Sequence, residues 1–275
     1  MKNRATSHGL RCMPALDGRT LVMGILNVTP DSFSDGGRFV DAERALRHAE
    51  SMVTDGADII DVGAESTRPT AQPLTADEEM ARLEPILPAL RSRVNVPISV
   101  DTYHSQTAEY ALNHGADIIN DVWGGLFDAD ILKVAAAYDC DYIYMHNRTE
   151  AVTAGAMETL VTETRAGIER CLKAGIAPGH LWIDPGIGFG KTYKQNLQIL
   201  RRLGEYCSLG YPVLLGTSRK SVIGNTLQTV ATDRLEGSLA TVSAGVLKGV
   251  RAVRVHDVKE TVRTCRMIEA IEHVE

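Results

Sequence analysis

The sequence predicts an α/β protein, a (β/α)8 TIM barrel with a short N-terminal extension. Short β-rich runs alternate with longer amphipathic stretches, and eight such pairs follow one another along the 275 residues. Eight β-α units in series are typical of this barrel. Polar side chains also stand at almost every predicted strand end, where such a barrel builds its active site. The alternative is a doubly wound open sheet, which favours a GxGxxG turn after the first strand, and this chain lacks that turn.

The strands are predicted from short apolar and β-branched runs. They cover Leu21–Asn27, Asp58–Val62, Ile98–Asp101, Asp117–Asp121, Tyr142–His146, Leu181–Asp184, Val213–Gly216 and Ala252–His256. Helical stretches are expected near residues 39–55, 76–93, 104–114, 128–138, 156–174, 193–204, 232–248 and 257–273. Thr75 and Glu78 have the spacing of a capping box, and Gly56, Gly115 and Gly249 suit helix C-caps.

Composition and charge narrow the class of protein. The net charge of -6 argues against a nucleic-acid partner or an anionic membrane surface. No run approaches the ~18 apolar residues of a membrane span. The five cysteines form no CxxC pair, which favours a reducing, cytoplasmic compartment. Residues 1–20 are expected to form the extension, and residues 21–275 a single barrel domain large enough for one core.

Strand parity predicts which strand-end side chains face the barrel interior, because side chains alternate between the interior and the helix layer. In the last strand Val253 and Val255 share one face, which is expected to pack against helices. Arg254 and His256 then share the inward face. A buried guanidinium without a partner is costly, so Arg254 is expected to meet an anion, an aromatic face or a strand-end aspartate.

The same parity brings three more polar side chains to one central pocket, namely Asp101, Asn120 and Asp184. A carboxylate accepts two parallel N–H bonds from the edge of an amino-pyrimidinone ring. Lys220 is placed to donate to the carbonyl oxygen of that ring, and Arg254 can stack on its face. A flat heterocycle is therefore an expected ligand.

A phosphate group is expected beside the ring. Asn27, Arg254 and His256 suit phosphate oxygens, and Asn27 with Asp31 and Asp35 suits a Mg²⁺ that keeps several waters. A ring and a phosphate in one barrel mouth predict group transfer in which phosphate or pyrophosphate leaves.

Five sequence stretches carry a resemblance to a known family. In chain order they are MGILNVTPDSFSDGG (23–37), DVGAESTRP (61–69), DPGIGFGKT (184–192), GTSRKSVIG (216–224) and VRVHDV (253–258). With them the chain resembles the dihydropteroate synthases of folate biosynthesis. That family joins 6-hydroxymethyl-7,8-dihydropterin pyrophosphate to p-aminobenzoate with release of pyrophosphate, and it is the sulfonamide target. Its members are (β/α)8 barrels and usually homodimers, so the resemblance implies the same fold, substrates, assembly and transferase activity here.

The resemblance also implies roles for individual residues. The implied pterin-binding set is Asp101, Asn120, Asp184, Lys220, Met145, Leu215 and Arg254. The implied pyrophosphate site is Asn27, Arg254 and His256, with Mg²⁺ held by Asn27 and, through water, by Asp35 of the catalytic loop. The implied p-aminobenzoate site is Phe33, Thr67, Arg68, Pro69, Phe189, Lys220 and Ser221.

Two alternatives to this function stay open at the level of sequence. The methyltetrahydrofolate-binding domain of corrinoid methyltransferases shares the pterin-pocket Asp and Asn residues. However, it has no use for a pyrophosphate site or for the SRKS segment at 218–221, both of which this chain contains. The second alternative is a catalytically inactive homologue that binds a pterin or a partner, and pyrophosphate release distinguishes it from an active enzyme.

Overall fold

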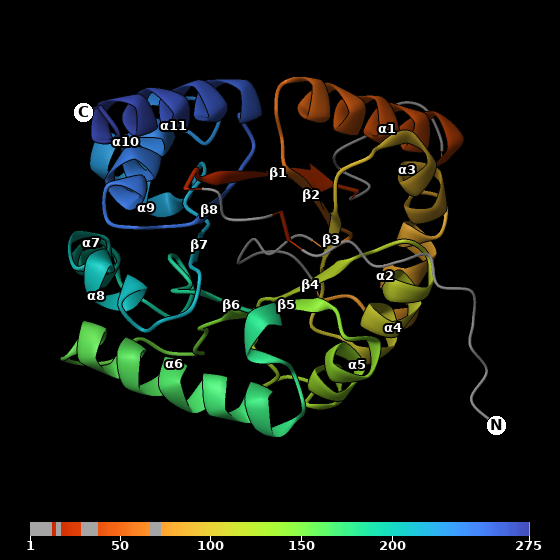
Figure 1. The fold of residues 1–275 in the computed structure, drawn as a ribbon, viewed down its shortest axis with the longest axis horizontal. Coiled ribbons are helices and arrows are strands. Elements are labelled where there is room, and N and C mark those ends of the chain that lie inside the picture. Colours follow the sequence, from red (N-terminus) through yellow and green to blue (C-terminus); the bar gives the residue numbers. More distant parts are fainter. Residues whose placement is uncertain (1–12, 15–17, 29–37, 66–72, 275) are drawn as a thin grey trace.

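The computed structural model of this chain describes residues 13–14, 18–28, 38–65 and 73–274. Within them, eight parallel strands form one sheet in the order β6-β5-β4-β3-β2-β1-β8-β7. The strands are β1 (Leu21–Asn27), β2 (Ile59–Gly63), β3 (Ile98–Asp101), β4 (Ile118–Asp121), β5 (Asp141–Met145), β6 (Leu181–Asp184), β7 (Leu214–Leu215) and β8 (Ala252–Val255). An isolated parallel bridge between Ile183 and Val213 joins β6 to the start of β7, so the sheet curves into a nearly closed barrel (Figure 1). The predicted TIM barrel is confirmed.

Helices surround the barrel on its outer side (Figure 1). They are α1 (Arg38–Thr54), α2 (Ala76–Leu83), α3 (Leu87–Arg93), α4 (Ser105–Asn113), α5 (Asp130–Tyr138), α6 (Ala156–Lys173), the 3-10 turn η2 (Pro178–His180), α7 (Tyr193–Arg201), α8 (Leu203–Cys207), α9 (Ser221–Leu227), α10 (Leu235–Val246) and α11 (Val258–Glu272). The predicted helix at 76–93 is two helices, because Pro85 and Pro88 interrupt the helical hydrogen-bond ladder. The sequence analysis also missed α9, which is too short to show a helical period.

Apolar side chains of the strands separate into two layers. The interior cluster consists of Leu21, Met23, Ile59, Ile118, Ile143, Trp182, Leu214 and Ala252. Val253 and Val255 belong instead to the outer cluster that packs under the helices. This confirms the predicted parity of β8 and places Arg254 on the interior side. Because the interior cluster fills the first half of the strands, the polar strand ends are left around the barrel mouth.

Local signals in the sequence also have the expected structure. Thr75 caps α2, since its Oγ accepts from the backbone N–H of Glu78 while the Glu78 carboxylate accepts from the backbone N–H of Thr75. Gly56, Gly115 and Gly249 each adopt a left-handed φ, as expected at helix C-caps.

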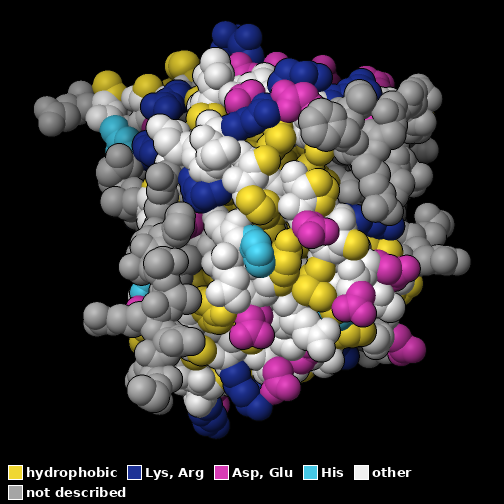
Figure 2. Space-filling model, turned by 90° about the vertical axis from the view of Figure 1, so that its right-hand side faces the viewer, with side chains coloured by type: hydrophobic (Ala, Val, Ile, Leu, Met, Phe, Trp, Pro, Cys, Tyr) yellow, Lys and Arg dark blue, Asp and Glu magenta, His cyan; other side chains and the backbone are white. Residues whose placement is uncertain are grey.

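The outer surface of α1 to α5 mixes acidic and basic side chains around an apolar band (Figure 2). In the part of the chain that the structure describes, no helix combines the length and the apolar character needed to cross a membrane.

Gly167 in α6 tests the packing of the helix layer on the barrel. A Cβ there would lie 2.3 Å from Cζ of Tyr144, whereas at Gly204 in α8 the nearest atom is the carbonyl oxygen of Lys248 at 3.9 Å. We expect Gly167→Ala to lower the free energy of unfolding by about 1–3 kcal/mol through overpacking. Gly204→Ala is expected to raise it by up to about 1 kcal/mol, because alanine has the higher helix propensity. Urea unfolding measures both, and equal effects would contradict the prediction.

Candidate active site

Arg254 lies at the centre of the barrel mouth. Its Nε is 2.6 Å from Oδ2 of Asp61, and its Nη2 is 2.7 Å from Oδ2 of Asp101. Of the three kinds of partner considered for this guanidinium, the structure shows strand-end carboxylates. Although burial lowers the pKa of Arg254, Asp61 and Asp101 raise it above its ordinary value. The arginine therefore stays charged and ties β8 to β2 and β3 across the mouth.

Asp61 is the residue of this cluster that the sequence analysis did not assign to the site. It is fully buried, and its Oδ2 also accepts a hydrogen bond of 3.4 Å from Nδ2 of Asn120. Its Oδ1 has no hydrogen-bond partner among the described residues. The signal was available, because Ile59 faces the interior and side chains two residues apart share a face. Asp121 instead forms a turn, accepting from the N–H groups of residues 123 and 125.

Two carboxylates share one guanidinium, and this changes the protonation of Asp101. Burial raises the pKa of Asp101 to about 7, Arg254 opposes the rise, and Asp61 adds to it. When both carboxylates are ionised, Asp61 and Asp101 carry more negative charge than Arg254 neutralises. A positively charged ligand next to them would therefore be stabilised.

A second group of side chains gathers over Gly216, just beyond β7. A Cβ at Gly216 would lie 3.7 Å from Oδ2 of Asp184, 3.7 Å from Nζ of Lys220 and 3.9 Å from Cβ of Arg254. Burial raises the pKa of Asp184 and lowers that of Lys220 to about 8, and in each case the opposite charge of the other residue counteracts the shift. The Asp184 carboxylate, the Lys220 ammonium and the base of the Arg254 side chain thus surround one space above a residue without a side chain.

Asn27 reaches the same mouth from β1. In the sheet register Asn27 pairs with Gly63, and Gly63 pairs with Asp101. A Cβ at Gly63 would lie 3.6 Å from Oδ1 of Asn27 and 3.7 Å from Cβ of Asp101. Asn27 and Asp101 therefore face each other across a second glycine, and the exposed Asn27 side chain stands at the rim.

The apolar wall of the site comes from β5 and from the loops after β3, β4 and β6. Met145 packs with Tyr103 and Val122, and Trp123 and Phe189 lie against this cluster. The Phe189 ring in turn carries the Lys220 ammonium, whose Nζ is 4.7 Å from the ring centre. Met145, predicted for the pterin pocket, and Phe189, predicted for the p-aminobenzoate site, thus lie in one cluster.

The placement of Leu215 on this wall is wrong. Its side chain belongs to the outer cluster, and a Cβ added at Gly245 of α10 would lie 2.6 Å from Cδ2 of Leu215. Leu214 points into the barrel instead. The reason is strand parity, since only every second residue of β7 can face the interior.

His256 follows β8 directly, two residues after Arg254. Its Nδ1 is 3.0 Å from Oγ of Ser218, and its backbone N–H donates to the same oxygen. This contact joins the loop after β7 to the end of β8. Ser221 is the first residue of α9 and is exposed at the rim.

Six of the predicted site residues lie outside the described part of the chain. They are Asp31, Phe33, Asp35, Thr67, Arg68 and Pro69. The predicted metal ligands can be tested only through Asn27. No group of three His, Cys, Asp or Glu residues in the described ranges is arranged to hold a metal ion. A single exposed amide oxygen does fit Mg²⁺, which commonly takes one or two protein ligands and completes its shell with waters and substrate phosphates.

Comparisons with known proteins agree with this geometry. Residues 23–256 match the pterin binding enzyme family. A dihydropteroate synthase of Bacillus subtilis (strain 168) is 46% identical over 253 residues, which are 92% of this chain and 89% of the relative. The crystal structure of dihydropteroate synthase from Clostridium difficile in the presence of pteroic acid matches with a TM-score of 0.91 at 46% identity, over 93% of this chain and 98% of that chain. The chain belongs to the dihydropteroate synthase family.

A second solved dihydropteroate synthase comes from Xanthomonas albilineans with 4-aminobenzoic acid. It is 38% identical with a TM-score of 0.90, and the match covers 94% of this chain and 95% of that chain. These matches cover more than nine-tenths of this chain, so the likeness to dihydropteroate synthases extends over the whole barrel. The corrinoid methyltransferase alternative is thereby set aside.

Asp61→Asn tests how the carboxylates share Arg254. Because a negative neighbour disfavours ionisation, we expect the pKa of Asp101, about 7 in the unchanged protein, to fall in the variant. A ¹³C NMR titration of aspartate carboxyl groups measures this shift. Asp257→Asn is the matched control, since Asp257 pairs with Arg219 instead. An unchanged Asp101 midpoint in Asp61→Asn would contradict the prediction.

Proposed function

We propose that the barrel mouth is the site at which this enzyme condenses 6-hydroxymethyl-7,8-dihydropterin pyrophosphate with p-aminobenzoate. The products are 7,8-dihydropteroate and pyrophosphate. The observation that carries the proposal is the convergence of Asp184, Lys220 and Arg254 over Gly216. A carboxylate and an ammonium above a glycine, beside the stem of an arginine, suit a flat ring with N–H donors on one edge and a carbonyl oxygen beside them.

The pterin ring binds through its polar edge. Asp184 accepts hydrogen bonds from the amino group and the adjacent ring N–H, and Lys220 donates to the ring carbonyl. Asn120 and Asp101 complete the set at the ends of β4 and β3. Arg254 stacks on one face of the ring. Met145 forms the apolar wall of this pocket.

The pyrophosphate group binds on the side of Asn27, Arg254 and His256. The guanidinium uses Nε and Nη2 for the two aspartates, and a guanidinium has five N–H donors, so it can bond phosphate oxygens as well. Asn27 is the proposed Mg²⁺ ligand, with Asp35 acting through water. Bound Mg²⁺ would neutralise negative charge on the leaving pyrophosphate.

The reaction is proposed to begin with departure of pyrophosphate from the methylene carbon. Arg254 and His256 stabilise the negative charge that develops on the leaving group. The electron-rich dihydropterin delocalises the remaining cation, and Asp101 and Asp184 stabilise it electrostatically. The amine of p-aminobenzoate then forms the new C–N bond and releases its proton. An anilinium is acidic enough that this step needs no strong general base.

The p-aminobenzoate site is proposed on the adjacent rim. Phe189, Lys220 and Ser221 contribute from the described part of the chain. Phe33, Thr67, Arg68, Pro69 and the catalytic residue Asp35 are proposed to complete it from the first two loops. Exclusion of water there protects the cation from hydrolysis.

The proposal also includes the oligomeric state and the cellular location of the enzyme. A homodimer is supported by exposed apolar side chains on neighbouring helices, with Tyr193 and Leu197 on α7 and Leu227 on α9. A cytoplasmic location is supported by the free thiols of Cys140, Cys171, Cys207 and Cys265, as expected in a reducing compartment.

The function is tested by pyrophosphate release from the dihydropterin pyrophosphate and Mg²⁺, with and without p-aminobenzoate. We expect release together with formation of dihydropteroate, and competition between sulfonamides and p-aminobenzoate. Pterin binding without turnover would support the inactive-homologue alternative instead.

Asp184→Asn tests the pterin pocket. An amide cannot accept two hydrogen bonds on the same edge without turning an N–H donor toward the ring. We expect kcat/KM for the dihydropterin pyrophosphate to fall about 10- to 100-fold, in line with the loss of a charge-assisted hydrogen bond of ~1.5–3 kcal/mol. Asp139→Asn is the matched control, because Asp139 is exposed far from the mouth in a left-handed conformation that asparagine tolerates. Full activity of Asp184→Asn would show that the ring binds elsewhere.

A further inference from the structure

Lys191 ends the loop that follows β6, and its side chain folds back into that loop. Its Nζ donates to the carbonyl oxygens of Gly186 at 2.9 Å and Phe189 at 2.9 Å. The same ammonium is 3.4 Å from the carbonyl oxygen of His146, at the end of β5. An ammonium has three N–H donors, of which two serve Gly186 and Phe189 and the third faces His146.

The loop is pressed closely against the chain that leaves β5. A Cβ at Gly186 would lie 1.9 Å from the carbonyl oxygen of His146, and a Cβ at Gly190 would lie 2.2 Å from that of Arg148. Both glycines have positive φ. The buried Ile187 and the hydrogen bond from the Gly188 N–H to Oδ1 of Asn196 anchor part of the loop, and the Lys191 contacts hold the carbonyls of Gly186 and Phe189 on either side of it.

His146 extends the network to α6. Burial, together with the charge of Lys191, lowers the pKa of His146 to about 4, so the imidazole is neutral near pH 7. Its Nε2 is 2.8 Å from Oε2 of Glu163 and therefore carries the proton. Nδ1 then presents a lone pair to Nζ of Lys191 at 3.1 Å. Arg148 donates to the other oxygen of Glu163, which fixes the carboxylate.

The same loop supports three groups of the proposed pterin pocket. The backbone N–H of Gly186 donates to Oδ1 of Asp184 at 2.7 Å. Lys220 donates to the carbonyl oxygen of Ile187 at 2.6 Å, and its ammonium lies over the ring of Phe189. A movement of the loop would therefore displace the carboxylate, the ammonium and the aromatic ring together.

We propose that Lys191 is a positioning residue for pterin binding, acting as an internal cation that holds the loop after β6 so that Asp184, Lys220 and Phe189 meet the ring correctly. The proposal rests on the proposed function, because it assumes that the pterin binds at Asp184. Lys191 itself does not touch the substrate. Its effect passes through the backbone of residues 186–189.

The charge of Lys191 gives the proposal a pH signature. Burial lowers the pKa of Lys191 to about 7; Asp184 and Glu163 counteract this, while Lys220 and Arg148 add to it. The neutral His146 adds no charge near pH 7. Below about pH 7 the ammonium form holds the loop, and above it the amine form holds the loop less strongly.

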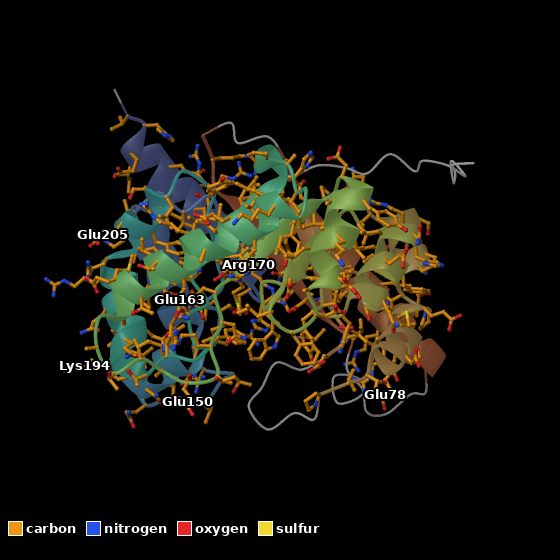
Figure 3. The ribbon with its side chains drawn as sticks, turned by 90° about the horizontal axis from the view of Figure 1, so that it is seen from below. Glu78, Glu150, Glu163, Arg170, Lys194 and Glu205 are labelled. Carbon is orange, nitrogen blue, oxygen red and sulfur yellow. The ribbon has the colours of Figure 1, made fainter. Side chains whose placement is uncertain are left out.

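The test compares Lys191→Met with Lys194→Met, a matched exposed lysine three residues further along the chain (Figure 3). Fluorescence titration of the full-length protein with 6-hydroxymethylpterin gives the Kd at pH 6 and pH 8.5. We expect Lys191→Met to weaken binding about 10- to 100-fold at pH 6, the scale of a misplaced binding group.

The ratio of variant to unchanged Kd should shrink at pH 8.5, because Lys191 has then lost its charge in the unchanged protein. Lys194→Met should bind within about 2-fold at both pH values.

Glu163→Leu keeps the test decisive if Lys191→Met does not fold. Glu163 is partly exposed, and its loss frees His146 to carry its proton on Nδ1, facing Lys191. We expect Glu163→Leu to bind the pterin more weakly, with a ratio of variant to unchanged Kd that again shrinks at pH 8.5. Glu150→Leu, on the preceding loop, should leave the Kd unchanged (Figure 3). Unaltered binding by folded Lys191→Met, or by Glu163→Leu where only that variant folds, would overturn the role of Lys191. A ratio that does not change with pH would overturn it too. Absence of pterin binding by the unchanged protein would overturn the proposed function itself.

Discussion

The ion pairs of Arg254 with Asp61 and Asp101 are the constraint on which the barrel mouth depends. They join residues 193 and 153 positions apart in the chain. Asp61 and Asp101 are buried, so removing Arg254 would leave two carboxylates uncompensated in a region of low dielectric. This network therefore fixes the ends of three strands relative to one another. It also presents a guanidinium, with donors to spare, at the place where a negative leaving group is proposed to form.

Burial around this ion pair brings several protonation equilibria close to neutral pH. The pKa of Asp101 rises to about 7, and that of Lys220 falls to about 8. In each case a neighbour of opposite charge, Arg254 for Asp101 and Asp184 for Lys220, opposes the pKa shift that burial causes. A ligand that adds or removes charge here changes these balances directly, so binding and proton uptake are expected to be linked.

Two lysines hold the glycine-rich loop after β6 through its backbone. Lys220 donates to the carbonyl oxygen of Ile187, and Lys191 donates to those of Gly186 and Phe189. Glycines allow the close approach to β5 that this arrangement needs, and lysines supply the rigidity that glycines lack. The loop thus combines a conformation that only glycine tolerates with a fixed position for the pocket.

The sequence by itself determined the eight β-α units, the polar strand ends and, through strand parity, the inward direction of Arg254. These follow from periodicity, which is a local property of the chain. It did not determine that Asp61 pairs with Arg254, that Leu215 packs under α10, or that Lys191 folds back onto two carbonyls of its own loop. Those contacts depend on how strands distant in sequence are brought together and on the curvature of the closed barrel. Only the tertiary structure decides them, because no local pattern records which distant residues share a space.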